Sequence, residues 1–337
     1  MSFRVRPASS DDFPAIYEMA KLTGGGFTNL PADKPTLVAK IERSEDSFAR
    51  VEDEQHGDMY LFVLENPETG AIRGTCQVFG SVGVIRPFYS YRLSTLTQHS
   101  EHLGKTFRNE TLSLTTDLEG SSEVGGLFLH PAERAGGLGM LLARSRYLFI
   151  REHRPRFGDL ILAELRGVMD ENGNSPFWDA LAGRFFGMSF PEADSFNAVH
   201  GTQFIADLMP KTSIYTAMLP DSARSVMGHP HATGRAALRM LENEGFRYDR
   251  YIDIFDGGPT VTAATDQIKS IRSARDYTVT AIDDGGIQQV IASAGQMKGF
   301  AACCAMITAE GDGATIDAGS AAALGLGVGG RFTAVAR

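Results

Sequence analysis

Cysteine is scarce in this sequence, and its spacing fits neither a covalent nor a metal-bound framework. Three cysteines occur among 337 residues, Cys76 and the adjacent pair Cys303 and Cys304. An odd number without metal-ligand spacing argues against disulfide bridges and against a zinc site. We therefore expect buried apolar thiols. Cys76 also lacks a recognisable activating partner, which argues against a nucleophilic role.

Long hydrophobic runs are missing as well. Apolar stretches such as Leu160-Ile161-Leu162-Ala163 are far shorter than the ~20 residues that cross a bilayer as a helix. The first residues, Met1 to Arg6, lack the apolar run that characterises a secretory signal. The sequence therefore predicts a cytoplasmic protein without a membrane anchor.

The sequence also lacks an excess of basic residues. The formal net charge is −9 and the sequence pI is about 5.4, whereas binding to a nucleic-acid backbone needs a basic surface. We therefore expect no nucleic-acid partner, and any anionic ligand must be bound by a local group of donors. The length of 337 residues, 43% of them hydrophobic, predicts about two globular domains.

Hydrophobic periodicity predicts a mixture of strands and helices. Ser9-Ser10-Asp11-Asp12 offers a helix N-cap, and Lys34-Pro35 opens a second amphipathic helix. Residues 23–28 contain three consecutive glycines and predict a flexible loop that exposes its backbone. Strands are predicted at 3–7, 59–64, 72–82, 123–129, 159–165 and 246–255, and further helices at 138–151, from Ser175 and at 235–244.

The remaining segments are less regular. Residues 85–118 are polar and aromatic and predict an insertion with irregular or strand structure. Short apolar runs at 278–282 and 289–292, in a stretch rich in Ala, Gly and Thr, predict a small β-rich C-terminal module. The side chains of the helix that begins at Ser175 are expected to form one apolar core face, made by Phe177, Trp178, Leu181, Phe185 and Phe186.

A glycine loop between a predicted strand and a predicted helix is the main chemical feature. It reads Arg-x-x-Gly-x-Gly, and its candidate ligand-binding residues are Arg134, Gly136, Gly137, Leu138 and Gly139. Glycines let backbone N–H groups approach an anion, and the helix start adds unpaired N–H groups and a positive dipole end. Neither a Rossmann fingerprint nor a Walker loop fits these residues. The pattern predicts a pyrophosphate site, although a plain glycine-rich turn has the same residues.

The order of the elements around this loop resembles the GNAT acyltransferase superfamily. That resemblance implies an α+β fold with a mixed, mostly antiparallel central sheet flanked by helices, and a small β-rich C-terminal module. We divide the chain accordingly into an acyl-CoA-binding core at 1–200, a second α/β segment at 201–265 and the C-terminal module at 266–337. The second segment would complete the active site and resembles a partial repeat of the core.

Several segments together resemble the arginine N-succinyltransferase family more closely. They are residues 23–31, 121–129, 166–168, 175–178 and 251–259. The resemblance covers about residues 3 to 260 and implies succinyl transfer from succinyl-CoA, as co-substrate, to the α-amino group of L-arginine or ornithine. It implies no tightly bound cofactor and no metal, and an oligomer of identical or related subunits. Two alternatives stay open: an N-acetyltransferase of another amine, or a non-catalytic acyl-CoA-binding subunit.

The resemblance also assigns residues. It implies that Leu127 contacts succinyl-CoA and that His231, in Gly228-His229-Pro230-His231, donates a proton. His229 is the alternative donor, because a shift of two residues would exchange the roles. Retaining the spacing to Glu244-Gly245-Phe246 favours His231.

Chemistry adds further candidates. The substrate amine must lose a proton before attack, and Glu123 or Glu164, each in or beside a buried strand, are candidate bases. Substrate carboxylates need cations and a guanidinium needs carboxylates. Candidates for these contacts are Arg92 and Arg166 for the carboxylates, and Asp170, Glu171 and Asp256 for the guanidinium. For each of these, a solvated charge or a turn cap is the competing interpretation.

Overall fold

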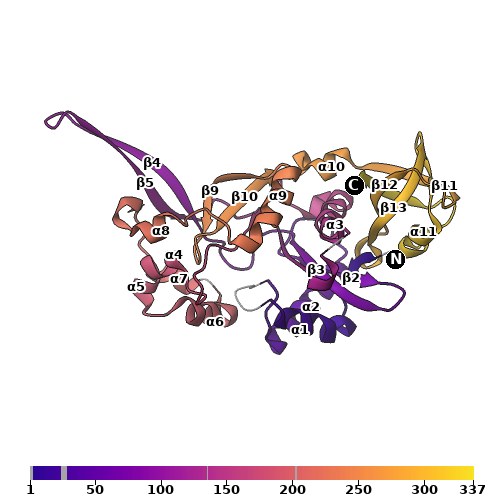
Figure 1. The fold of residues 1–337 in the computed structure, drawn as a ribbon, viewed down its shortest axis with the longest axis horizontal. Coiled ribbons are helices and arrows are strands. Elements are labelled where there is room, and N and C mark those ends of the chain that lie inside the picture. Colours follow the sequence, from indigo (N-terminus) through magenta and orange to yellow (C-terminus); the bar gives the residue numbers. More distant parts are fainter. Residues whose placement is uncertain (1–2, 24–28, 135, 202) are drawn as a thin grey trace. The chain divides into compact units, whose positions relative to one another are not determined.

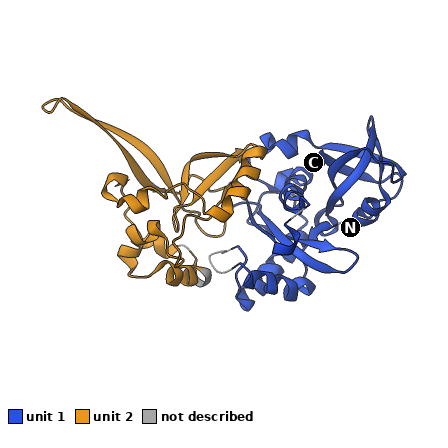
Figure 2. Ribbon diagram, viewed as in Figure 1, with its two compact units in different colours: residues 1–81, 121–161, 264–337 blue, residues 82–120, 162–263 orange. Residues whose placement is uncertain are grey.

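A computed structural model describes residues 3–23, 29–134, 136–201 and 203–337. The predicted glycine-rich loop at 24–28 and Ala135 lie outside the described residues. The chain forms two compact units (Figure 2), each built from segments distant in sequence. Unit 1 comprises residues 1–81, 121–161 and 264–337, and unit 2 comprises 82–120 and 162–263. These units do not coincide with the three consecutive segments proposed from the sequence.

Unit 1 carries an antiparallel sheet and a small barrel (Figure 1). Its elements are β1 (Arg4–Pro7), α1 (Phe13–Lys21), α2 (Lys34–Ala49), β2 (Met59–Asn66), β3 (Ala71–Phe79), β6 (Ser122–Leu129), α3 (Leu138–Glu152), α10 (Lys269–Ser273), β11 (Arg275–Ile282), β12 (Gln288–Ala294), β13 (Ala301–Glu310), β14 (Gly313–Ile316), α11 (Ala318–Leu324) and β15 (Arg331–Ala336). The predicted strands and helices of this part of the chain agree with these bounds to within a few residues.

Strands β13, β1, β2, β3 and β6 lie side by side in that order, and each neighbouring pair is antiparallel. Helices α1 and α2 bury Ile16, Leu37 and Ile41 against Leu61 and other side chains of β2. Asp33 caps α2 by accepting a hydrogen bond from the Thr36 N–H at 2.9 Å, as short polar residues do at helix starts. Periodic apolar residues and capping therefore fix both helices on the sheet.

The C-terminal strands close on themselves. Their order is β12, β15, β11, β14 and β13, and a further pairing of β12 with β13 completes the ring. The interior holds many small side chains, including Ala292, Ala305, Ala314 and Ala334. A barrel of so few strands has a narrow interior, which small residues can fill. The predicted strands at 278–282 and 289–292 lie within β11 and β12.

Unit 2 combines an antiparallel sheet with short helices. Its strands lie in the order β10, β9, β4, β5 and β8. Its elements are β4 (Ser90–Ser100), β5 (Lys105–Thr115), α4 (Pro176–Ala180), α5 (Gly183–Phe186), α6 (Phe190–His200), α7 (Gln203–Leu208), β8 (Ile214–Tyr215), α8 (Asp221–Arg224), α9 (Arg235–Glu244), β9 (Arg247–Asp253) and β10 (Pro259–Ala264), and β7 (Leu160–Glu164) leads into it from unit 1.

The aromatic helix predicted from Ser175 is interrupted. Phe177 and Trp178 are completely buried in α4, but the helix ends at Leu181, whose φ of −117° and ψ of −90° are not helical. The chain resumes as α5, and Phe185 is 51% exposed. The prediction of one continuous core face is therefore wrong for Phe185, because the chain changes direction at Leu181 between α4 and α5.

Residues 85–118 form a long β-hairpin, which the sequence left open between strand and irregular structure. Tyr91 and Leu112 anchor its base in the core of unit 2. Farther out, β4 and β5 pair only with each other among the described residues, and Figure 1 shows both strands extending away from the rest of unit 2. The hairpin is thus an arm with two free edges.

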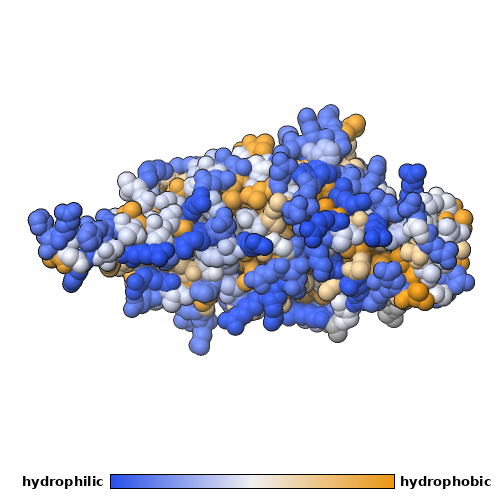
Figure 3. All heavy atoms as spheres, turned by 90° about the horizontal axis from the view of Figure 1, so that it is seen from above, coloured by the Kyte–Doolittle hydropathy of each residue, from blue (hydrophilic) through white to orange (hydrophobic). Residues whose placement is uncertain are grey.

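Hydrophilic residues dominate the face drawn in Figure 3, and hydrophobic residues occupy smaller patches. Within the described ranges, no helix has both the length and the apolar character needed to cross a membrane.

Candidate active site

The glycine loop lies between β6 and α3, as the sequence predicts. A short 3-10 turn at Pro131–Glu133 leads to Arg134, and Gly137 is the N-cap of α3. Gly136 and Gly137 have φ values of +89° and +83°, a region that residues with a side chain rarely adopt. The backbone thus turns sharply into a helix of 15 residues, whose first N–H groups lack intrahelical acceptors.

Two arginines accompany this loop. Arg134 is exposed, and the guanidinium of Arg337 donates a hydrogen bond to the Gly136 carbonyl oxygen. Arg144 of α3 donates to the Ala336 carbonyl oxygen at 2.7 Å, which holds the end of β15 beside the helix. Arg337 could not be found from the sequence, because 201 positions separate it from Gly136.

Strand β6 contains a β-bulge just before Leu127. Thr75 pairs with Phe128 and Gln77 pairs with Gly125, so Gly126 and Leu127 together lie opposite a single residue of β3. Gly126 has φ +57°, and its carbonyl oxygen accepts a hydrogen bond from Thr75 Oγ1 at 3.1 Å. A bulge disrupts the ladder locally, so this part of β6 departs from the regular pairing with β3 beside Leu127.

Four polar side chains of unit 1 gather beside the bulge. Glu123 is 8% exposed and Gln77 is completely buried. Gln77 Nε2 donates to Asn29 Oδ1 at 2.5 Å, and Lys40 Nζ donates to the Asn29 carbonyl oxygen at 2.6 Å. Burial lowers the pKa of Lys40 to about 7, although the charge of Glu123 acts in the opposite direction. Only Glu123 of this group is predicted from the sequence as a site residue, since no motif marks the other three.

His231 and His229 differ in their surroundings. The His231 backbone N–H donates to the Arg166 carbonyl oxygen at 2.7 Å, and His231 Nδ1 accepts a hydrogen bond from the Thr233 N–H at 3.3 Å. His231 Nδ1 also lies 2.8 Å from Thr233 Oγ1, to which a protonated ring would donate its Nδ1–H. Burial and the charge of Arg166 lower the pKa of His231. His229 is exposed.

Arg166 and Asp256 lie in the same part of unit 2 as His231. Asp256 accepts hydrogen bonds from the Gly167 N–H at 2.7 Å and the Gly258 N–H at 2.8 Å. Both of its oxygens are thereby engaged by the backbone, the contacts of a structural carboxylate. Arg166 differs, because its buried Nε has no hydrogen-bond partner among the residues described. An unpaired buried donor is costly, and a substrate carboxylate would satisfy it.

The other predicted substrate-binding residues have local partners or lie in solvent. Arg92 pairs with Asp117 at 3.3 Å and its guanidinium stacks over the ring of Tyr251 at 5.1 Å. Asp170 accepts hydrogen bonds from the Asn172 and Asn174 N–H groups, both at 2.8 Å, and so stabilises its own turn. Glu171 follows in the exposed part of that turn, and the half-buried Glu164 accepts from Thr260 Oγ1 at 3.4 Å.

The candidates therefore form two groups, one in each unit. Unit 1 brings together the glycine loop, the bulge and Glu123, whereas unit 2 brings together His231, Arg166 and Asp256. Cys76 and Cys303 are buried free thiols, and burial raises the pKa of Cys76 to about 11. In the described ranges, no group of three or more His, Cys, Asp and Glu side chains is arranged to hold a metal.

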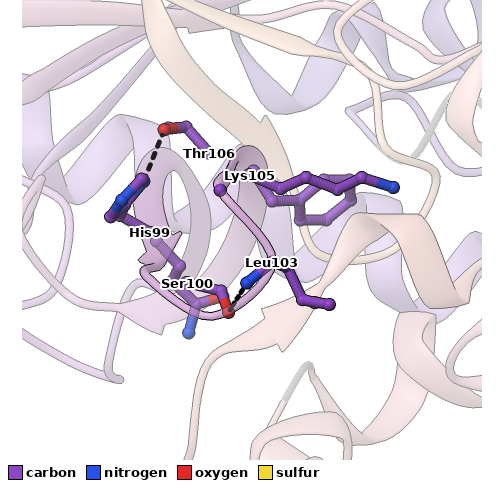
Figure 4. A pocket seen from close by; sticks show the side chains of 8 residues that line it. His99, Ser100, Leu103, Lys105 and Thr106 are labelled. Atoms are coloured by element: carbon purple, nitrogen blue, oxygen red, sulfur yellow. Dashed lines mark hydrogen bonds between the residues drawn. The ribbon is translucent and has the colours of Figure 1, made fainter.

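A surface pocket lies elsewhere, at the tip of the β4–β5 hairpin (Figure 4). His99 Nδ1 and Thr106 Oγ1 are 2.9 Å apart across the hairpin, and the Leu103 N–H donates to Ser100 Oγ at 3.4 Å. The pocket contains none of the predicted site residues. Its contacts are those of a hairpin turn, and it plays no part in the candidate site.

Comparison with known proteins adds independent information. The profile of a family described as arginine N-succinyltransferase beta subunit matches residues 3–270. An arginine N-succinyltransferase of Citrobacter koseri is 44% identical over 271 residues, which are 80% of this chain and 78% of that protein. An arginine N-succinyltransferase subunit beta of Pseudomonas aeruginosa is 44% identical over 275 residues, 82% of this chain and 80% of that protein.

The similarity extends to three dimensions. The structure of an arginine/ornithine succinyltransferase subunit AI from Pseudomonas aeruginosa matches with a TM-score of 0.91 and 33% sequence identity. The match covers 99% of this chain and 98% of that chain. It confirms the predicted GNAT-like α+β fold class, and it includes the C-terminal barrel beyond the residues that the family profile matches.

Proposed function

This chain belongs to the arginine N-succinyltransferase family, and we propose that it transfers a succinyl group from succinyl-CoA to the α-amino group of L-arginine. The observation that carries the proposal is 44% identity to named arginine N-succinyltransferases over about four fifths of the chain. Under this proposal the chain is an acyltransferase of arginine catabolism, and succinyl-CoA is its co-substrate.

The donor's pyrophosphate binds at the glycine loop. The N–H groups of Gly137, Leu138 and Gly139 at the start of α3 donate to its oxygens, and Arg134 and Arg337 supply positive charge. The fit is supported by the positive φ values of Gly136 and Gly137, which bring bare backbone to the ligand. Leu127, half-buried at the bulge, contacts the acyl end of the donor.

The acyl transfer proceeds without a covalent enzyme intermediate. The α-amine loses a proton to Glu123, directly or through water, and its nitrogen attacks the thioester carbonyl carbon. The C–N bond forms first, and an N–H of the β6 bulge stabilises the oxyanion of the resulting tetrahedral intermediate. The nitrogen then releases its second proton to water, and the C–S bond breaks as the carbonyl group re-forms to give the amide. The thiolate of CoA leaves and takes a proton from His231.

Arg166 is the best-supported of the proposed substrate-binding cations. Its unpaired buried Nε offers a charge-assisted hydrogen bond to a carboxylate, either of the amino acid or of the succinyl group. Arg92 already pairs with Asp117, and Asp256 already accepts two backbone hydrogen bonds. Asp170 likewise accepts two backbone hydrogen bonds, and both of them use Oδ1, so Oδ2 of the exposed Asp170 and the exposed Glu171 are the candidates for binding the guanidinium.

A thiol-release assay tests the proposed reaction. The purified chain is given succinyl-CoA or acetyl-CoA, each with L-arginine or L-ornithine, and free CoA is measured. We expect turnover with succinyl-CoA and arginine, and at most slow turnover with acetyl-CoA. Absence of thiol release with succinyl-CoA and either amino acid would overturn the proposal, and preference for acetyl-CoA would favour an N-acetyltransferase.

The names of two relatives contain the word subunit. We propose that this chain likewise assembles with identical or related subunits and acts in the cytoplasm, where acyl-CoA thioesters are available. The second candidate function, a non-catalytic acyl-CoA-binding subunit, rests on the same names. Turnover by the purified chain alone would exclude it, and turnover only after addition of a related subunit would support it.

A further inference from the structure

Gln77 of β3 has an unsatisfied hydrogen-bonding group beside the bulge. The residue is completely buried, and its Nε2 donates to Asn29 Oδ1 at 2.5 Å. Its Oε1 has no hydrogen-bond partner within the described part of the chain. A buried carbonyl oxygen without a donor destabilises the folded state. Such an oxygen therefore indicates a site for a ligand that donates a hydrogen bond to it.

The oxygen faces a stretch of backbone that carries no side chains. A Cβ atom on Gly126 would lie 2.8 Å from Gln77 Cγ and 3.1 Å from Gln77 Oε1. A Cβ atom on Gly125 would lie 3.1 Å from Asn29 Nδ2 and 3.4 Å from Glu123 Oε1. Two amides and a carboxylate thus converge on two glycines, and a side chain at either glycine would occupy the space between them.

The neighbouring Thr75 shows what a purely structural polar residue looks like here. Its Oγ1 donates to the Gly126 carbonyl oxygen at 3.1 Å and so holds the bulge. In Gln77, by contrast, Nε2 is fixed by its hydrogen bond to Asn29 Oδ1, whereas Oε1 has no hydrogen-bond partner among the described residues. Fixing one end of an amide orients the other, so Oε1 has a defined direction before any ligand binds.

The missing partner must be an N–H or O–H donor, and the charges nearby favour a cationic or neutral amine. Glu123 is a carboxylate beside the same glycines, whereas Lys40 directs its ammonium to the Asn29 carbonyl oxygen at 2.6 Å. The proposed reaction brings an amine to the bulge, because the thioester carbonyl that it attacks is bound there.

We propose that Gln77 Oε1 binds the acceptor's α-amino group, accepting a hydrogen bond from one of its N–H bonds and directing the nitrogen lone pair toward the thioester carbon. Gln77 is then a specificity-determining residue for a primary amine, and this inference rests on the proposed function. A substrate whose α-nitrogen is methylated loses one donor and fits this subsite less well.

The test compares Gln77→Met with Ser44→Ala. Methionine keeps the length of the side chain but removes both the orphan oxygen and the hydrogen bond from Nε2 to Asn29 Oδ1. Ser44 is a completely buried residue of α2 whose Oγ accepts from the N–H of Leu61, the strand partner of Gln77, at 2.9 Å, so Ser44→Ala removes a structural bond close to Gln77 without removing the orphan oxygen. Thermal melting, steady-state kinetics and isothermal titration of L-arginine in the presence of CoA are measured for both variants and the wild type.

We expect Gln77→Met to raise the Michaelis constant for arginine by about tenfold, as loss of one hydrogen bond to the substrate does. The Michaelis constant for succinyl-CoA stays within about twofold. Its melting temperature is close to that of Ser44→Ala, because each variant loses one buried hydrogen bond. Ser44→Ala melts lower than the wild type and keeps both Michaelis constants.

The outcomes separate the inference from the proposed function. If the wild type turns over arginine and Gln77→Met has the same Michaelis constant for it, the inference is wrong and the proposed function stands. If no turnover occurs but arginine binds the wild type at least tenfold more tightly than Gln77→Met, the reaction is wrong and the amine subsite stands. If the wild type neither binds nor turns over an amino acid, both are wrong.

Discussion

His231 is held differently from its neighbour His229, and this difference supports the assignment of the proton donor. Its main-chain N–H is bound by the Arg166 carbonyl oxygen, and its Nδ1 is held by Thr233. In the imidazolium form, which is the form that can protonate a thiolate, Nδ1–H donates to Thr233 Oγ1 2.8 Å away, and Nε2–H is left for transfer. His229 is exposed, with its main-chain N–H bound to the Val226 carbonyl oxygen.

Replacing His231 therefore has a specific kinetic consequence. We expect His231→Ala to lower kcat by about a hundredfold or more, as loss of a positioned acid does, with little change in the Michaelis constant for succinyl-CoA. His229→Ala is the matched control and should keep wild-type turnover. Thiol-release kinetics measure both, and equal turnover by His231→Ala and the wild type would remove His231 from the mechanism.

At the scale of elements, strand β15 brings a cation to the glycine loop. The guanidinium of Arg337 binds the Gly136 carbonyl oxygen, beside the N-terminus of α3. We expect Arg337→Gln to raise the Michaelis constant for succinyl-CoA by about tenfold, equivalent to roughly 1.4 kcal/mol. The control is Arg331→Gln, at the exposed arginine that begins β15, the strand that Arg337 follows. An unchanged constant in Arg337→Gln would show that the loop binds the donor without this residue.

The turn between β9 and β10 predicts a pH effect on stability. Burial raises the pKa of Asp253 and of Asp256, the latter to about 7. An unfolded aspartate loses its proton near pH 3.9, so from about pH 4 to 7 the folded protein binds more protons than the unfolded chain. These two groups therefore make the free energy of unfolding fall as the pH rises through this window.

Asp253→Asn tests that effect without breaking the turn. Both hydrogen bonds to Asp253, from the Phe255 N–H at 2.6 Å and the Asp256 N–H at 2.8 Å, use Oδ1, which asparagine retains. Urea unfolding between pH 5 and 8 should show a smaller loss of stability in the variant than in the wild type. Asp170→Asn is the control, because the pKa of Asp170 is lowered and it stays ionised across this range. Equal slopes for Asp253→Asn and the wild type would contradict the assignment.

Helix starts, helix ends and tight loops were predictable, because the residues that determine them are close together in the sequence. Capping at Asp33, the glycine loop before α3 and the Gly245 end of α9 all follow from residues near one another in sequence. Contacts between distant segments left no such signal. The positions of Arg337 beside Gly136 and of Gln77 opposite Gly125 depend on strand pairing, and the orphan atoms of Gln77 and Arg166 appear only once burial is known.

For the whole molecule, the sequence predicted the fold class and the family but not how the chain is divided. Segments 82–120 and 162–263 form one compact unit, although unit 1 supplies the residues between them. A linear division cannot represent this interleaving, because hydrophobic patterns show which residues are buried but not which segments share a core. The closed barrel also depended on non-local pairing of β12 with β13.

Assembly is the prediction at this scale that is tested most simply. A single chain has a mass of 36.4 kDa. We expect light scattering of the purified protein to give a multiple of that mass, because relatives are described as subunits. A mass of one chain at micromolar concentration, unchanged after a related subunit is added, would contradict the proposed assembly.

The central claim is that the succinyl group is transferred to the α-nitrogen of arginine, and the structure of the product tests it most directly. The purified chain is incubated with succinyl-CoA and L-arginine, and the product is analysed by mass spectrometry and by NMR of the α-proton. We predict one new species with the succinyl group on the α-nitrogen and a free guanidinium. Succinylation of the guanidinium, or unmodified arginine after prolonged incubation, would contradict the account.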